Sequence, residues 1–310
     1  MADVAQLVES QIVILVVAGS SPVVRPTVYP KPNLKAPELK GPFSIRVSTM
    51  KKFDFLSILF GLLLTMIAAY FMMRPTSANS APISSIPVTQ IGNVMWDQTE
   101  MTIADVKQFA NQTGFISQAE KNGGGLSYES GFVKKPGWTW KTPYGVPANE
   151  KEPAVHLNQA EAAAICRHYG KRLPTDSEWI TAAFVEQRIS PPAGYTKAQR
   201  YPYPGGSNAT VSHCLSGCGD YTGVAPAGAL NRGTGHVITG TTKPGVNGLY
   251  DMGGNVWEWT ATGQGNGFIT RGASWWYGPD RQQESDIEVK PADIGVVYIG
   301  FRCVADSVKQ

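Results

Sequence analysis

The fold of this chain is decided by a glycine-rich stretch with two closely spaced tryptophans, Asn247-Gly-Leu-Tyr-Asp-Met-Gly-Gly-Asn-Val-Trp-Glu-Trp259. Two shorter stretches follow it, Arg271-Gly-Ala-Ser-Trp-Trp276 and Gly300-Phe-Arg-Cys303. Apolar and aromatic residues between glycine-rich loops predict short strands over residues 254–260, 267–274 and 298–304.

Three helices are predicted upstream of these strands. Each begins with Thr or Asn followed by an acid three positions on, and the first two end at glycine. They cover residues 102–114, 158–170 and 175–187. A loop-rich region, residues 191–248, then leads to the strands. Helices followed by short strands and long loops indicate an α+β domain with much irregular structure.

Composition divides the chain into an N-terminal region and one compact domain. All eight Trp, four Cys and four His lie after residue 95. We therefore place the domain at residues 89–306, after a linker over residues 75–88. Residues 1–49 are interpreted as a disordered arm or as sequence upstream of the true start at Met50.

Residues 50–74 are predicted to be a transmembrane anchor or signal peptide, because residues 56–73 carry no charge. The inner membrane is the expected partner, and Lys51 and Lys52 favour a domain on the periplasmic side of the bacterial inner membrane. Cleavage near the small residues 77–81 is the alternative, and it would release a soluble periplasmic protein.

Charge and cysteine content narrow the function classes. The net charge is +3, and no run of basic residues is longer than two, which argues against nucleic acid as a partner. Four cysteines in an exported domain favour disulfides. A copper-binding or redox-active pair at Cys214 and Cys218, next to His213, is the alternative.

The ordered motifs resemble those of the formylglycine-generating enzyme, or sulfatase-modifying-factor, family, a variant of the C-type lectin fold. The resemblance covers roughly residues 90–306 and includes the segments 119–121, 153–156 and 171–175. It implies a disulfide between Cys166 and Cys303, which leaves Cys214 and Cys218 as a local pair. It also makes His156 a structural residue.

The resemblance further implies a structural calcium ion in the Asn247–Trp259 stretch. Its ligands would be Asp251, the main-chain oxygens of Gly254 and Val256, and Glu258, which are hard oxygen donors of the kind calcium takes. An acid pair that solvates a turn is the alternative. A second calcium site would begin at Asn208, but the insertion with Cys214 and Cys218 obscures its remaining ligands.

The chain departs from the family at the two copper-binding cysteines that follow the Arg-Gly-Gly-Ser motif. Those positions fall on Tyr277 and Gln282, and neither can supply the thiolate that selects copper. A copper or iron ion would therefore lack the cysteine pair that usually binds the metal in this family. The chain is thus similar to the cysteine-less branch of the superfamily, which includes the periplasmic pyoverdine-maturation oxidase.

The stretch that replaces the cysteines offers a phenol, two acids and a guanidinium. The candidate catalytic residues are Tyr277, Asp280, Arg281 and Glu284, and the candidate ligand-binding residues are Trp276, Tyr277 and Arg281. A surface ion pair between Asp280 and Arg281 is the alternative. Neighbouring residues of a strand face opposite sides of the sheet. We therefore expect one of Trp275 and Trp276 to pack in the core and the other to line the pocket. Trp138 and Trp140 are expected to cover the core.

Three functions follow. The main expectation is oxidative modification or maturation of a peptide or small metabolite. The first alternative is a non-catalytic lectin-like binding module for a protein, peptide or glycan. The second is a formylglycine-generating oxidase that uses Cys214 and Cys218.

Overall fold

The structure is a computed structural model that describes Met66 and residues 81–226 and 228–307. These residues, Met66 aside, belong to the second of the two units into which the chain divides, Pro75–Gln310. The predicted arm (1–49), the predicted anchor apart from Met66, and residues 75–80 of the predicted linker lie outside the described residues.

Helices occupy mainly the first half of the described domain. The helices are α2 (Ile103–Thr113), α3 (Gln118–Lys121), α4 (Gln159–His168) and α5 (Asp176–Phe184), with 3-10 turns η1 (Val246–Gly248) and η2 (Pro279–Gln282). Capping explains where α2 and α4 begin. The side chains of Thr102 and Asn158 accept main-chain N–H groups in the first turn, and Gly114 ends α2 in the left-handed conformation. Both predicted helices are confirmed.

The third helix is shorter than predicted. Its Thr175 and Glu178 form the expected capping box, but α5 ends at Phe184 rather than Gln187. Val185 turns to an extended conformation and pairs with Arg200 instead. A capping box at Ser117 also begins α3, a helix that the sequence analysis missed.

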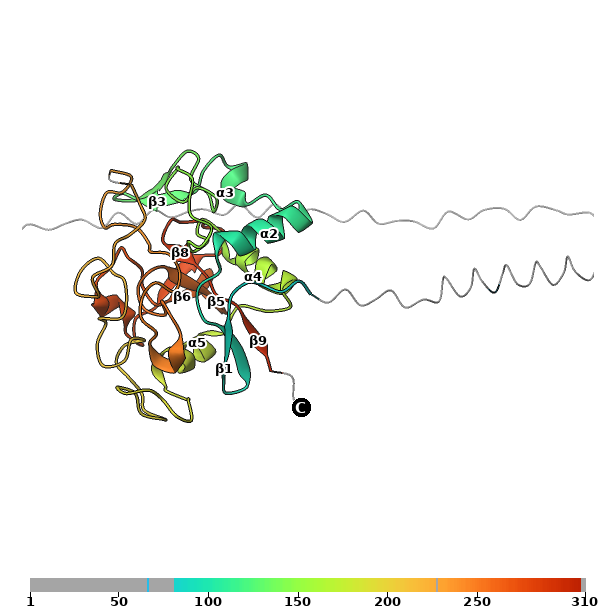
Figure 1. Ribbon diagram of the computed structural model, residues 1–310. Coiled ribbons are helices and arrows are strands. Elements are labelled where there is room, and N and C mark those ends of the chain that lie inside the picture. Colours follow the sequence, from blue (N-terminus) through green and yellow to red (C-terminus); the bar gives the residue numbers. More distant parts are fainter. Residues whose placement is uncertain (1–65, 67–80, 227, 308–310) are drawn as a thin grey trace, which may run out of the picture. The chain divides into compact units, whose positions relative to one another are not determined.

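Nine short strands form three sheets in the described residues. The strands are β1 (Val88–Ile91), β2 (Val94–Asp97), β3 (Leu126–Tyr128), β4 (Phe132–Lys134), β5 (Trp257–Gln264), β6 (Gly267–Arg271), β7 (Glu288–Pro291), β8 (Ile299–Gly300) and β9 (Val304–Asp306). Their orders are β1-β2-β9, β3-β4 and β7-β6-β5-β8. All neighbours are antiparallel except β5 and β8. In Figure 1, α4 lies above β5 and α5 below it, and both helices pack against this strand.

The main core contains most of the tryptophans. Trp138 and Trp140 are buried in it, as predicted. The prediction for Trp275 and Trp276 is wrong, because both side chains are buried, at 0% and 3% exposure. β6 ends at Arg271, so these two residues follow the strand and its alternation of faces does not apply to them.

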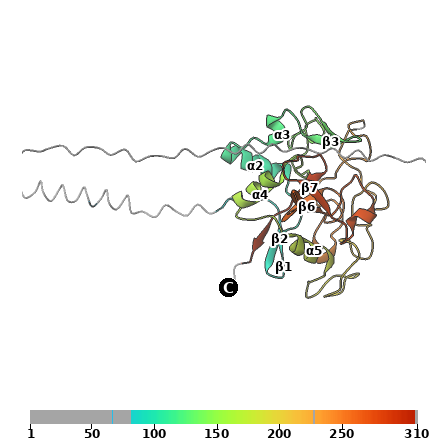
Figure 2. The same ribbon diagram turned by 180° about the vertical axis from the view of Figure 1, so that it is seen from behind.

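Two disulfides stabilise the domain, Cys166–Cys303 and Cys214–Cys218. These are the pairs that the resemblance implied. The first links α4 to the residue before β9. Figure 2 shows α4 from behind, together with β1 and β2 of the sheet to which β9 belongs. No free cysteine remains in the described part of the chain. Two disulfides indicate an oxidising environment.

The predicted membrane anchor requires correction. Among the described residues, no helix is long and apolar enough to cross a membrane. The longest of the domain's helices, α2, has 11 residues and spans about 16 Å, whereas a bilayer core is about 30 Å thick. This finding overturns the inner membrane as a partner. The stretch 56–73 itself lies outside the described residues apart from Met66.

Candidate functional site

Tyr277 lies in an aromatic cluster that follows β6. Its ring centre is 5.7 Å from that of Trp257 and 6.3 Å from that of Tyr298. The rings of Trp276 and Tyr298 are 5.7 Å apart. Tyr277 is half-buried, whereas the other three are buried. Burial raises the pKa of Tyr277, and Glu288 raises it further, so the phenol is protonated at neutral pH.

Two guanidinium groups contact these rings. Arg281 lies 5.2 Å from the ring centre of Tyr277, and Arg232 lies 5.8 Å from it and 5.7 Å from the ring of Trp276. Contacts of this kind stabilise by about 0.5–2 kcal/mol each. We name this group the Tyr277 surface and define it as Trp276, Tyr277, Tyr298, Arg232 and Arg281. Trp276 and Tyr298 form its buried base, and Tyr277 and the two arginines reach the solvent. Neither Arg232 nor Tyr298 was identified from the sequence, since they come from distant segments.

The structure brings only some of the candidate catalytic residues together. Arg281 contacts Tyr277, but its charge is balanced by Asp286, at 2.6 Å, and by Glu288. Asp280 is exposed. No ion pair joins it to Arg281 in the described part of the chain, so the alternative surface pair does not form. Glu284 pairs with Arg200. The two acids therefore do not converge with Tyr277.

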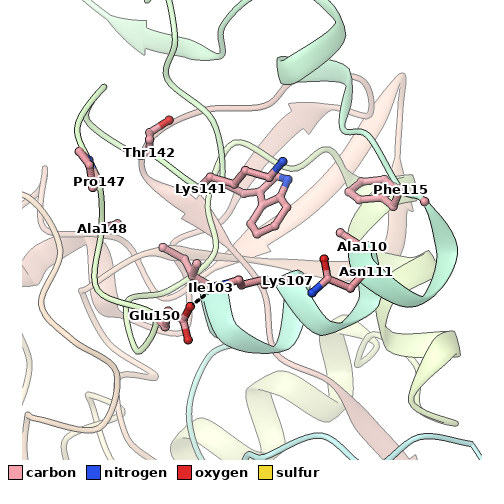
Figure 3. Close-up of a pocket in the computed structure, with 12 residues that line it drawn as sticks. Ile103, Lys107, Ala110, Asn111, Phe115, Lys141, Thr142, Pro147, Ala148 and Glu150 are labelled. Carbon is pink, nitrogen blue, oxygen red and sulfur yellow. Dashed lines mark hydrogen bonds and ion pairs between the residues drawn. The ribbon is translucent and has the colours of Figure 1, made fainter.

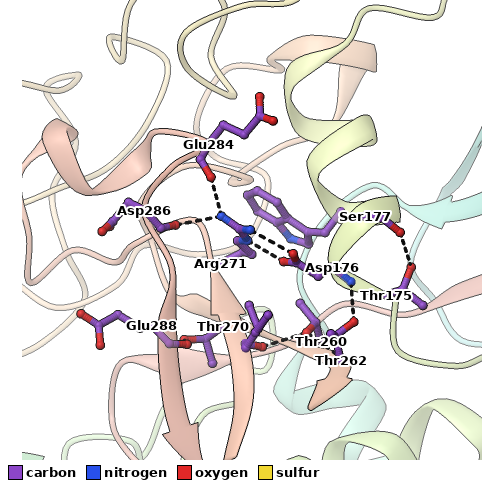
Figure 4. A network of polar contacts seen from close by, with 12 residues as sticks. Thr175, Asp176, Ser177, Thr260, Thr262, Thr270, Arg271, Glu284, Asp286 and Glu288 are labelled. Carbon is purple, nitrogen blue, oxygen red and sulfur yellow. Dashed lines mark hydrogen bonds and ion pairs between the residues drawn. The ribbon is translucent and has the colours of Figure 1, made fainter. Parts of the chain in front are cut away.

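A buried arginine holds the segment after Tyr277 in place. Arg271 donates two hydrogen bonds to the carboxylate of Asp176 at the start of α5, at 2.6 and 3.0 Å. Its Nη1 donates to the main-chain oxygens of Glu284 and Asp286 (Figure 4). Bidentate pairs of this type fix geometry as well as charge. Arg271 thus positions the loop that carries the candidate residues.

The Cys214–Cys218 loop lies against both positions where the family has cysteines. Leu215 donates its main-chain N–H to the carbonyl of Tyr277 at 2.9 Å. The side-chain amide of Gln282 lies 3.2 Å from Sγ of Cys218. Because the two cysteines are joined, neither sulfur is a thiolate, and only a thiolate acts as a nucleophile or copper ligand. The geometry therefore gives no support to an oxidase that uses this pair.

The predicted calcium ligands lie in a buried polar cluster. The carboxylate of Asp251 accepts from the N–H of Gly240 at 2.8 Å and from the hydroxyl of Thr242 at 2.5 Å. Glu258 accepts from Arg302 and from Nε1 of Trp179 at 2.8 Å. Asn208, proposed for a second site, instead accepts from Thr210 in a local turn.

Glu100 joins this cluster, although no sequence pattern pointed to it. It is fully buried, and Oε2 has no hydrogen-bond partner among the described residues. Burial raises the pKa of Glu100 well above its usual range, and Asp251 and Glu258 raise it further. Three buried carboxylates thus face one buried cation, Arg302. Oε2 of Glu100 is a spare oxygen donor of the kind calcium takes, whereas Asp251 and Glu258 already accept hydrogen bonds. No three acidic, His or Cys side chains of the described residues converge on one point.

The buried histidines are structural rather than metal-binding in the described part of the chain, where no three His, Cys, Asp or Glu side chains converge. His236 lies between the hydroxyl of Tyr144, at 2.8 Å, and the carboxylate of Glu152, at 2.9 Å. His156 donates to the carbonyl of Pro143 and is fully buried. No partner for His236 could be predicted from the sequence, because its side-chain contacts lie more than 80 residues away along the chain.

A separate cavity of about 490 Å³ lies between α2 and the loop that follows Trp140 (Figure 3). Its two lysines are already paired, Lys107 with Glu150 and Lys141 with Glu120. None of the residues identified from the sequence as catalytic, ligand-binding or metal-binding lines it.

The short strands, capped helices and disulfide-closed core define the C-type-lectin-like fold of formylglycine-generating enzymes. The chain belongs to the family of the sulfatase-modifying factor enzyme 1-like domain, which it matches over residues 69–307.

Several characterised relatives bear on function. Mouse formylglycine-generating enzyme is 28% identical, with 53% of this chain and 48% of that protein covered. Bovine inactive C-alpha-formylglycine-generating enzyme 2 is 31% identical, with 54% and 56% covered. Hercynine oxygenase of Mycolicibacterium thermoresistibile is 28% identical, with 59% and 37% covered. The chain thus spans about half the length of the first curated relatives it matches.

Solved structures resemble the domain at lower identity. PvdO from Pseudomonas aeruginosa has a TM-score of 0.48 and 15% identity, with 75% of this chain and 88% of that chain covered. CarF has a TM-score of 0.46 and 16% identity, with 70% and 88% covered.

Proposed function

We propose that the domain is a binding module of the periplasm, and that it holds a peptide or a segment of a protein on the Tyr277 surface. Two disulfides support an oxidising, exported location. Aromatic and arginine side chains are the residues most enriched where proteins bind peptides and other proteins.

One observation carries this proposal: the family's cysteine positions are filled by a phenol and a buried amide. Tyr277 is half-buried between two guanidinium groups, and Gln282 is covered by the Cys214–Cys218 loop. Neither residue supplies a thiolate. The arrangement offers the partly exposed ring of Tyr277 and positive charge, which are means of binding rather than of oxidation.

The test is capture of short peptides from an array by the full chain and by Tyr277→Ala. We expect wild type to bind a subset at least about tenfold more tightly than the variant, as for a residue central to an interface. Tyr203→Ala is the matched control, since Tyr203 is also half-buried and has no ring contact with the Tyr277 surface. Equal capture by wild type and Tyr277→Ala would overturn the proposal, and so would capture confined to a parallel glycan array.

We also propose that calcium is bound by Asp251, Glu258 and the main-chain oxygens of Gly254 and Val256. The unpartnered oxygen of Glu100 supports an additional carboxylate ligand. The role would be structural, because the ion would neutralise buried acids that Arg302 alone does not balance.

Oxidative modification is the second candidate, favoured by the relatives named formylglycine-generating enzyme and hercynine oxygenase. It would need copper or iron held without the usual cysteine pair. Its test is the mass of a captured peptide after incubation in air with each metal. A changed mass that requires the protein supports this candidate, and an unchanged mass with both metals rejects it.

A further inference from the structure

Arg232 differs from most arginines of the domain in having no acidic partner. Six others form ion pairs: Arg172, Arg188, Arg200, Arg271, Arg281 and Arg302. Among the described residues, only Arg167 and Arg232 have no carboxylate within ion-pair distance, and both are exposed. Arg167 is on α4, whereas Arg232 belongs to the Tyr277 surface.

The guanidinium of Arg232 is held in place although it is exposed. Its Nη2 donates to the main-chain oxygen of Trp276, and its plane lies near the rings of Trp276 and Tyr277. A guanidinium has five N–H donors, so this bond leaves others for a ligand. A side chain ordered before binding loses less entropy when a ligand arrives.

The surroundings of Arg232 leave its charge uncompensated. Arg281, on the other side of Tyr277, is balanced by Asp286 and Glu288. The neighbouring Asn231 donates to the carbonyl of Tyr128 at 3.1 Å, which ties this loop to the end of β3.

An apolar patch lies where the end of β3 pairs with the start of β4. The rings of Tyr128 and Phe132 are 5.5 Å apart in an edge contact, and these side chains are 45% and 47% exposed. The residue next to the uncompensated cation thus bonds to the strand end that carries this exposed aromatic pair. Such a pair of features matches a ligand that has an anionic group next to an apolar side chain.

We propose that Arg232 binds a carboxylate of the peptide held on the Tyr277 surface, so that the ligand class is a peptide with a free C-terminal carboxylate beside an apolar residue. This inference rests on the proposed function. A carboxylate and a guanidinium match in geometry and form paired, charge-assisted hydrogen bonds. Tyr128 and Phe132 would contact the apolar residue.

The experiment compares two probes, acetyl-Gly-Leu-Phe with a free carboxylate and the same peptide with a C-terminal amide. Binding to the full chain is measured by titration calorimetry at low salt and again at higher salt. We expect the acid to bind at least about tenfold more tightly than the amide, the size of one charge-assisted contact. The preference should weaken as salt rises, because the contact is exposed.

Matched variants locate the effect. Arg232→Gln should bind the acid no better than the amide, and Arg232→Lys should keep part of the preference because it keeps the charge but not the planar donor pair. Arg167→Gln removes another exposed charge that has no acidic partner among the described residues, and it should keep the full preference. Unfolding curves of each variant show whether the fold is intact.

The outcomes separate the two proposals. Equal binding of acid and amide by wild type, or a preference that survives in Arg232→Gln, overturns the role of Arg232. If Tyr277→Ala nevertheless loses binding of both probes, the Tyr277 surface remains the binding site. If Tyr277→Ala binds both as wild type does, or if wild type binds neither probe, both proposals fail for this ligand class.

Discussion

Nη2 of Arg302 lies 2.6 Å from Oε1 of Glu258, and the two side chains are 0% and 1% exposed. The remaining donors of Arg302 reach the main-chain oxygens of Asp97, Gln98 and Tyr250. One guanidinium thus connects the start of β5 to the end of β2 and to the loop before the predicted calcium ligands.

Arg302→Met should therefore reduce the free energy of unfolding by about 3–5 kcal/mol, because it leaves a buried carboxylate without its cation. Chemical denaturation measures this loss. Lys107→Met breaks the exposed pair with Glu150 and should cost less than about 1 kcal/mol. Similar losses of unfolding free energy in Arg302→Met and Lys107→Met would contradict this prediction.

The two disulfides should differ in their contribution to stability. Cys166–Cys303 spans 137 residues and Cys214–Cys218 spans 4. The chain-entropy relation gives about 5 kcal/mol for the first and about 2 kcal/mol for the second. The double serine variant of each pair is compared by denaturation. A larger loss of unfolding free energy on removal of Cys214–Cys218 than on removal of Cys166–Cys303 would show that the short-loop disulfide has a role beyond chain entropy.

Calcium should raise the melting temperature if the Asp251–Glu258 loop holds it. An ion present at a hundredfold excess over its dissociation constant stabilises by about 2.7 kcal/mol. Scanning calorimetry after chelation, and after calcium is returned, measures the shift. Glu100→Gln should weaken calcium binding without abolishing it. An unchanged melting temperature in wild type rejects the calcium site.

Acid should destabilise the domain through His156. Burial lowers its pKa from 6.5 to about 4, so the folded state favours the neutral ring. This contribution is present above pH 6.5 and is lost as the pH falls towards 4, by about 3 kcal/mol in total. Burial raises the pKa of Asp97 to about 6, so this carboxyl makes the folded state more stable as the pH falls, opposite to His156.

His156→Asn isolates the effect of that histidine. Asparagine tolerates the positive φ of 60° at this position. The stability difference between wild type and variant should narrow by about 3 kcal/mol between pH 7 and pH 4. A constant difference across this range would show that His156 does not titrate with a lowered pKa.

The helices could be predicted because their signals are local. A cap residue and an acid three positions on define where α2, α4 and α5 begin, within one turn of chain. The end of α5 depended on Val185 pairing with Arg200, a tertiary contact. Strands such as β1, β3 and β7, with three or four residues each, are too short for their alternation to be recognised.

The site could be predicted only where it follows a motif. Tyr277 was found by its place after the Arg271–Trp276 stretch. Arg232 was missed because its contacts with Trp276 and Tyr277 join segments 44 residues or more apart. Glu100 was missed for the same reason, since its partner Asn255 is 155 residues away. Motifs record neighbours along the chain, and these contacts are made by folding.

Both ends of the domain belong to one small sheet, because β1 and β9 lie on either side of β2. Val88 pairs with Asp97 and Asp306 pairs with Val94, so the two residues lie at opposite ends of β2 and two strand spacings apart. Strand geometry gives a separation of roughly 14 Å, which a short glycine linker can bridge. Such a domain suits circular permutation and insertion into the loop of a host protein, since neither requires the ends to move apart. The Tyr277 surface could then be displayed on a carrier with both connections made at a single sheet.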